Sequence, residues 1–112
     1  MLISGLIMGA NGGIGSTYNL IAGSFVELYQ HASSGRWEEA RRTQGRVNEF
    51  ISVLLNYPIH PAIKQVLAWT GIDCGTCIAP RRQLSPAEQQ NLRERLVKTE
   101  LGGKLLAASK HT

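Results

Sequence analysis

The sequence is poor in cysteine, proline and aromatic residues, and it has no long apolar run. It contains two cysteines and four prolines, and aromatic residues make up 6% of its 112 residues. Two cysteines are too few for a disulfide-stapled secreted scaffold, so we interpret Cys74 and Cys77 as free thiols. The apolar opening at residues 1–8 is far short of the roughly 20 residues that span a bilayer. These absences predict a cytoplasmic protein with no membrane partner.

Metal ligands are scarce as well. Cys74 and Cys77 form a C-x-x-C pair, but a structural zinc site needs four ligands and no second pair follows. A thioredoxin-like dithiol would follow a strand and open a helix, whereas this pair follows a predicted helix. The sequence therefore predicts no metal and no cofactor.

Charged residues are only 18% of the chain, and the net charge is +4. Four arginines lie close together, at Arg36, Arg41, Arg42 and Arg46. A basic face can bind nucleic acid, but no helix-turn-helix or RNA-binding signature accompanies it. We interpret the cluster as a solvated helix face or a subunit contact, and we expect no nucleic-acid partner.

Apolar residues recur at three- and four-residue spacing, which predicts successive helices. The expected helices cover residues 18–34, 37–56 and 61–70. The breaks fall at Gly35, at Tyr57 before Pro58, and at Gly71, because these positions favour helix ends. Residues 72–84 show no clear period and are predicted to be a loop.

A strong start signal follows this loop. Ser85 is suited to cap a helix, Pro86 to occupy its first position, and Glu88 to return a bond to the cap. We expect this last helix to stop at Gly102 and Gly103 and to leave residues 104–112 as a flexible tail. One short strand is predicted, at residues 12–15.

The glycine-rich stretch at residues 9–19, GANGGIGSTYN, has two interpretations. Its spacing is typical of a turn that lets a dinucleotide pyrophosphate approach the backbone before a helix. That fold also needs a second strand with an acidic residue at its end. Residues 36–42 stand in that place, and their composition is helical. The dinucleotide interpretation is therefore disfavoured.

The longer word GGIGSTYN resembles the last barrel strand of the N-acetylneuraminate lyase family. That family comprises pyruvate-dependent aldolases on the eight-stranded β/α barrel and has the dihydrodipicolinate synthases as relatives. The resemblance implies an α/β fold, with residues 1–34 as helix 7, strand 8 and helix 8 of a TIM barrel. Residues 35–103 resemble the family's helical extension. The chain is thus expected to be a mostly α-helical carboxyl-terminal third of a longer enzyme.

The same resemblance implies a function. Such an enzyme cleaves sialic acid reversibly to N-acetylmannosamine and pyruvate through a lysine imine, and it forms a tetramer. By resemblance, Ser16 contacts the hydroxylated tail of the substrate at the carboxyl end of the strand, where barrel enzymes place their chemistry. A structural alternative is that Ser16 caps the following helix. The small residues Gly12, Gly13 and Gly15 would leave room for the ligand and allow tight strand packing.

The imine lysine lies on an earlier strand in the family, so this chain is expected to hold no catalytic residue and to be inactive alone. Its four lysines, Lys64, Lys98, Lys104 and Lys110, fall on late helices or the tail. Without a barrel to cover its apolar stripes, the chain should be marginally stable or self-associating. Two other functions remain open: another pyruvate aldolase of the superfamily, and a truncated, non-catalytic helical interaction module.

Overall fold

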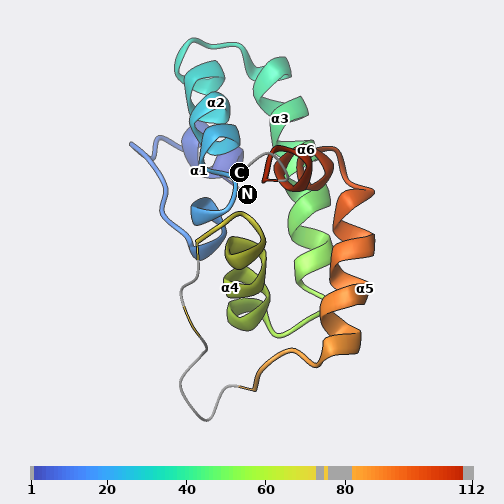
Figure 1. Cartoon of the computed structure of the whole chain (residues 1–112). Helices are drawn as coiled ribbons and strands as arrows, with labels where there is room; N and C mark the ends of the chain where they lie inside the picture. Colours follow the sequence, from blue (N-terminus) through green and yellow to red (C-terminus); the bar gives the residue numbers. More distant parts are fainter. Residues whose placement is uncertain (1, 73–74, 76–81, 110–112) are drawn as a thin grey trace. The chain divides into compact units, whose positions relative to one another are not determined.

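The computed structural model describes residues 2–72, 75 and 82–109. The chain divides into two compact units, Met1–Asn48 and Glu49–Thr112. All regular elements among the described residues are helices, as Figure 1 shows. They are α1 (Leu2–Ile7), the 3-10 helix η1 (Ser16–Asn19), α2 (Ala22–Ser33), α3 (Trp37–Leu54), α4 (Ile59–Trp69), α5 (Pro86–Val97) and α6 (Glu100–Ser109).

The first unit is built from α1, η1, α2 and the first part of α3. Helix α1 packs against α2, and the backbone N–H of Ile3 donates to Gln44 Oε1 on α3 at 3.0 Å. Most buried side chains of this unit are apolar, and they recur at helical spacing. The apolar ones are Leu20, Ile21, Phe25, Leu28, Ala32, Ala40 and Val47, and the buried polar ones are Thr43 and Gln44.

Helix α2 ends where the sequence predicts a break. Gly35 adopts a left-handed conformation with φ of +76°, which a side chain would make costly. The backbone N–H of Arg36 then donates to the His31 carbonyl at 2.8 Å, and that of Gly35 to Ala32 at 3.1 Å. These bonds satisfy carbonyls that the end of a helix leaves without partners. The predicted helix over residues 18–34 is shorter in the structure, because η1 and a turn precede α2.

The strand predicted at residues 12–15 is not formed within the described part of the chain. Gly15 is extended, with φ of −174° and ψ of 158°, so the backbone conformation is compatible with a strand. A strand also needs a neighbour to which its N–H and C=O groups can bond. No neighbouring strand is present among residues 2–72, 75 and 82–109, so residues 12–15 have no strand with which to pair.

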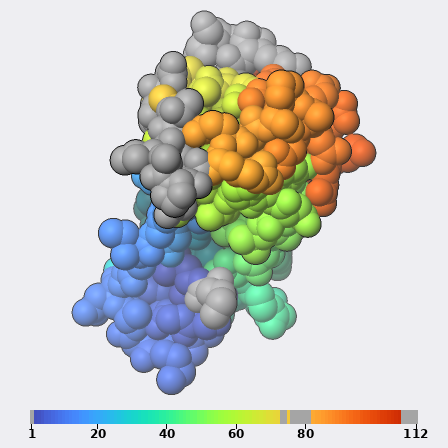
Figure 2. Space-filling model, turned by 90° about the horizontal axis from the view of Figure 1, so that it is seen from below, coloured from blue at the N-terminus to red at the C-terminus, as the bar shows by residue number. Residues whose placement is uncertain are grey.

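The second unit contains the end of α3 with α4, α5 and α6. Helix α5 contacts both α4 and α6, and its orange surface is seen in Figure 2. The core of this unit is apolar; it comprises Phe50, Leu54, Ala62, Ile63, Val66, Leu84, Leu92, Leu96 and Leu106.

Helix α4 begins at Ile59, two residues before the position that the sequence predicts. Pro61 is tolerated there because the first turn of a helix has no internal acceptor for its N–H groups. The predicted end is confirmed: Gly71 has φ of +99°, and the Ile72 N–H donates back to the Leu67 carbonyl at 2.9 Å.

The capping box that opens α5 is confirmed. Ser85 Oγ accepts from the Glu88 N–H at 3.2 Å, and Glu88 Oε1 accepts from the Ser85 N–H at 3.0 Å. Arg82 adds two bonds to the same carboxylate, at 2.7 and 2.9 Å. The Glu88 carboxylate therefore accepts three hydrogen bonds at the start of α5, two from Arg82 and one from the Ser85 N–H.

The predicted end of the last helix is wrong. Helix α5 stops at Val97, and a new helix, α6, runs through Gly102 and Gly103 to Ser109, over most of the expected flexible tail. Thr99 makes the corner: its hydroxyl donates to the Leu96 carbonyl at 2.7 Å and accepts from the Gly102 N–H at 3.0 Å. A Cβ on Gly102 would overlap the Leu96 carbonyl oxygen. The glycines thus permit a close approach between two helices and do not end one.

Among the described residues, no helix is long and apolar enough to cross a membrane.

Candidate functional site

Ser16 lies at the start of η1, directly after Gly15, whose backbone is extended. Its side chain is exposed, and its backbone carbonyl accepts from Asn19 Nδ2 at 3.1 Å. The residue that precedes η1 is Gly15, and the residue that precedes α2 is Ile21; neither helix start has a side-chain cap. The capping role considered for Ser16 is therefore not realised in this structure.

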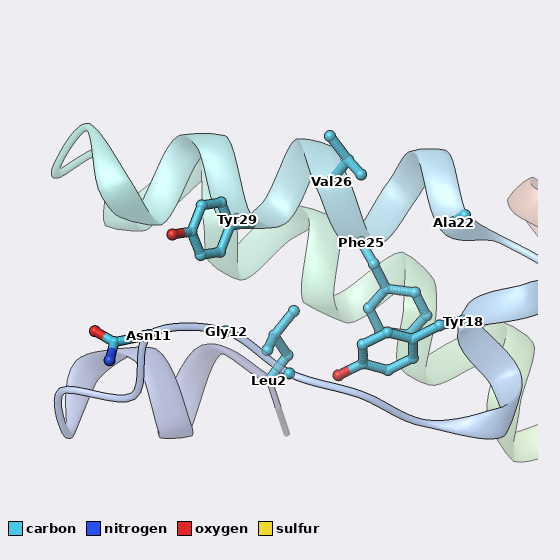
Figure 3. A pocket seen from close by; sticks show the side chains of 9 residues that line it. Leu2, Asn11, Gly12, Tyr18, Ala22, Phe25, Val26 and Tyr29 are labelled. Carbon is cyan, nitrogen blue, oxygen red and sulfur yellow. The ribbon is translucent and has the colours of Figure 1, made fainter.

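A pocket of about 360 Å³ lies beside this segment, between α1, the glycine-rich segment and α2 (Figure 3). Its walls are mostly apolar. The lining residues are Leu2, Asn11, Gly12, Gly13, Tyr18, Ala22, Phe25, Val26 and Tyr29. Gly12 and Gly13 of the predicted site line it, whereas Ser16 does not.

The aromatic floor of the pocket is a stacked pair. The rings of Tyr18 and Phe25 lie 3.8 Å apart between centroids with an angle of 20° between their planes, and Figure 3 shows them one above the other. Phe25 is buried, so this pair fixes η1 against α2. Sequence reasoning missed the role of Tyr18, although its place in GGIGSTYN beside the glycines is a usable signal.

The Tyr18 ring lies so close to two of the glycines that it leaves little room for a side chain at either position. A Cβ on Gly15 would come within 3.2 Å of Tyr18 Cε1, and one on Gly13 within 2.8 Å of the Tyr18 hydroxyl. Gly12 is different, since a Cβ there would meet nothing within 4 Å. Tight packing is therefore observed at Gly13, against both Leu2 and Tyr18, and at Gly15, against Tyr18.

The described residues contain no group of three or more His, Cys, Asp or Glu side chains able to hold a metal. Cys74 and Cys77 lie outside the described residues, so their interpretation as free thiols stays a prediction.

The lysines stand on the helical part of the chain. Lys64 is on α4, and Lys98 follows the last residue of α5. Lys104, on α6, pairs with Glu100 at 3.4 Å. Lys110 lies outside the described residues.

A charge network holds the start of α5. The Arg82 guanidinium, and after it the Ser85 backbone N–H, lower the pKa of Glu88 from its ordinary value of 4.5 to about 2. The bond to Glu88 raises the pKa of Arg82 in return. Both pKa shifts favour the charged forms of Arg82 and Glu88. Because this pair stabilises the start of α5, we assign it a structural role.

Two of the four clustered arginines pair with carboxylates on the surface of the first unit. Arg41 lies 3.3 Å from Glu38, and Arg46 lies 3.4 Å from Glu27. Exposed pairs of this kind contribute little to stability. The arrangement agrees with a solvated helix face.

Comparison with known proteins places these features in a family. The model of the dihydrodipicolinate synthetase family matches residues 1–99. Over 94 residues the chain is 40% identical to the N-acetylneuraminate lyase of Rhizobium meliloti (strain 1021), covering 84% of this chain and 31% of that protein. It is 29% identical, also over 94 residues, to the N-acetylneuraminate lyase of Fusobacterium nucleatum subsp. nucleatum, with 84% and 32% covered.

The chain thus spans about a third of the length of the curated relatives it matches. The matched region includes both the glycine-rich segment and most of the helices that follow it. On this match, the chain belongs to the dihydrodipicolinate synthetase family.

Proposed function

We propose that the chain is the carboxyl-terminal part of a Schiff-base pyruvate aldolase, an N-acetylneuraminate lyase that cleaves sialic acid to N-acetylmannosamine and pyruvate. The observation that carries this proposal is the 40% identity to the Rhizobium meliloti lyase. The word GGIGSTYN, which resembles the last barrel strand of the lyases, supports the same choice. In this proposal the enzyme is a cytoplasmic homotetramer that needs no metal or cofactor.

Ser16 is the proposed substrate contact in this chain. It follows Gly15, whose backbone is extended; its side chain is exposed, and it caps neither η1 nor α2. A hydroxyl both donates and accepts a hydrogen bond, which suits a polyhydroxylated sugar tail. In this role Ser16 selects the sugar and leaves the pyruvate chemistry untouched.

The imine chemistry belongs to the part of the enzyme that this chain does not cover. An imine-forming lysine must be partly deprotonated, which requires a desolvated site or a neighbouring cation. Lys104 is exposed and paired with Glu100, and Lys98 is exposed, so neither has that setting. The chain alone is therefore proposed to be inactive, with residues 1–34 completing the barrel and residues 35–103 as its helical extension.

A chimera tests the proposal. The aligned region of the Rhizobium meliloti lyase is replaced by residues 1–112 of this chain, and pyruvate release from N-acetylneuraminate is followed. We expect cleavage by the chimera and none by the 112-residue chain. Trapping with borohydride in pyruvate then shows whether the imine forms.

Substitution of Ser16 refines this test. Ser16→Ala should raise KM for N-acetylneuraminate by about tenfold, which corresponds to the loss of one hydrogen bond to an uncharged group. Borohydride trapping with pyruvate should be unchanged. Ser33→Ala, an exposed serine at the end of α2, is the matched control. A folded chimera without cleavage would contradict the proposal.

A second candidate is another pyruvate aldolase of the same family. It is favoured by the family model itself, whose description names dihydrodipicolinate synthetase. A chimera that traps pyruvate but acts on a different aldehyde would support it. A chimera that folds and traps no pyruvate would instead favour a non-catalytic helical interaction module.

A further inference from the structure

An asparagine is followed by a glycine once in the sequence, at Asn11 and Gly12. In such a pair the backbone nitrogen of the glycine can close a five-membered ring on the side-chain amide carbon of the asparagine. A reaction within one molecule gains a large rate advantage when its two atoms can meet. A Cβ on the second residue would crowd the nitrogen and restrict its φ, and glycine has none. The pair therefore has the chemistry of a site that modifies itself.

The local structure leaves both reacting groups free to meet. Asn11 lies in an exposed bend between α1 and η1, and Gly12 is exposed beside it. The backbone bonds that end α1 reach as far as the Ala10 N–H, and the next N–H to donate is that of Tyr18. Within the described part of the chain, neither the Asn11 side chain nor the Gly12 N–H makes a hydrogen bond. Both residues line the open pocket of the first unit (Figure 3), where water can reach them.

The other four asparagines are held in place, and none precedes a glycine. Asn19 Nδ2 donates to the Ser16 carbonyl at 3.1 Å. The N–H that follows it, on Leu20, donates to the Thr17 carbonyl, also at 3.1 Å. The remaining three are Asn48, Asn56 and Asn91, whose side chains bond to Gln44, Ser52 and Tyr57. Sequence and structure thus single out the same asparagine.

We propose that Asn11 is a site of spontaneous deamidation in the folded chain, with solvent water as the only other reactant. The Gly12 nitrogen attacks Cγ of Asn11, so that an N–Cγ bond forms and the Cγ–Nδ2 bond breaks. Ammonia leaves and carries away the Gly12 amide proton. Water then opens the cyclic imide, its hydroxyl ending on carbon and its proton on nitrogen. Opening at Cγ yields aspartate, and opening at the backbone carbonyl carbon yields isoaspartate.

Either product changes the pocket beside the pair. One new carboxylate lowers the formal net charge from +4 to +3, and it stands at a pocket whose walls include Leu2, Phe25 and Val26. A carboxylate is costly to bury against apolar walls, so deamidation disfavours any packing that closes this pocket. The reaction needs only the folded chain and water, so it goes beyond the proposed function and does not depend on it.

The experiment follows the full 112-residue chain during storage in mildly alkaline buffer. Peptide mass spectrometry measures the gain of one mass unit at each asparagine, and electron-transfer fragmentation separates aspartate from isoaspartate. We expect conversion at Asn11 to be at least ~10-fold faster than at any other asparagine, a difference of about 1.4 kcal/mol in activation free energy. Equal or faster conversion at another asparagine would overturn the proposal.

The variant Gly12→Ala tests the role of the attacking nitrogen. A Cβ at Gly12 would meet nothing within 4 Å, and the φ of Gly12 is not positive, so alanine fits there without strain. Its methyl group crowds the nitrogen, and conversion at Asn11 should fall by ~10-fold or more. Gly23→Ala is the matched control, because Gly23 has the same open space and no positive φ. This control should leave the rate unchanged. An equal rate in the two variants would overturn the proposal.

A comparison of the folded and the unfolded chain tests the role of the structure. Because no described hydrogen bond holds Asn11 or Gly12, conversion in the folded chain should lie within ~10-fold of that in urea. A larger difference would mean that the structure must open before the reaction occurs, and it would overturn the proposal. Circular dichroism checks that both variants keep the helices of the parent chain.

Discussion

Gly102 lies directly against the backbone carbonyl of Leu96, with no room between them for a Cβ atom. Thr99 closes the same corner by bonding to both residues. The corner leaves only two residues, Lys98 and Thr99, between the end of α5 and the start of α6. The packing of α6 against α5 in the second unit therefore requires glycine at position 102.

The first prediction concerns this corner. Gly102→Ala should lower the free energy of unfolding by about 1–3 kcal/mol, as expected when a well-packed site is overfilled. Chemical denaturation followed by circular dichroism measures the change.

Gly45→Ala is its control, because Gly45 lies within α3 and a Cβ there would meet nothing within 4 Å. This change should raise the free energy of unfolding by up to about 1 kcal/mol, since alanine is the better helix former. Equal effects of the two substitutions would contradict the role assigned to Gly102.

The second prediction concerns the cap of α5. Ser85→Ala should lower the free energy of unfolding by about 0.5–2 kcal/mol, because the Glu88 N–H loses its acceptor. Ser85→Asn retains a capping oxygen and should stay near the parent value. If the alanine and asparagine variants unfold alike, the capping box does not stabilise the helix.

The third prediction is a pH dependence. The pKa of Glu88 is lowered to about 2 in the folded chain, by Arg82 above all. A lowered folded pKa favours the ionised group, so its contribution is complete above the ordinary value of 4.5 and is lost as the pH falls from there to about 2. Urea unfolding across this range measures the loss.

Three variants test the role of the Glu88 carboxylate. Glu88→Gln should flatten the pH dependence in this window, whereas Glu94→Gln on the same helix should leave it in place. Arg82→Ala should move the midpoint of the Glu88 carboxyl signal, observed by NMR, upward toward 4.5. An unmoved midpoint would contradict the role of Arg82.

The fourth prediction concerns the floor of the pocket. Tyr18→Leu and Phe25→Leu should each destabilise the first unit, and the double variant should cost less than their sum. The expected coupling is about 0.5–1.5 kcal/mol, the usual value of an aromatic pair beyond its buried area. A coupling of zero in this double-mutant cycle would mean that the two rings stack without mutual stabilisation.

Local signals in the sequence account for most of the helices. Ser85, Pro86 and Glu88 predict the start of α5, and Gly35 and Gly71 mark helix ends, because each works through bonds to residues within a few positions. The apolar spacing of α3 predicts its extent to within two residues of its end at Leu54. Such features need no knowledge of distant parts of the chain.

The failures come from contacts that local patterns do not contain. Gly102 and Gly103 resemble a helix end by propensity, but close packing on α5 makes them part of a helix. Gly15 is extended, but residues 12–15 have no neighbouring strand among the residues that the structure describes. Ser16 stays a prediction as a substrate contact, and the stack of Tyr18 on Phe25 depends on side chains seven residues apart.

The corner at Thr99 also bears on the order in which the chain folds. Its bonds join residues three positions apart, so forming it closes very short loops and restricts little of the chain. Contacts of such short range form quickly. The turn between α5 and α6 can therefore form before the long-range packing does, on the timescale of a single helix. Helix α4 can then pack against this preformed pair of helices.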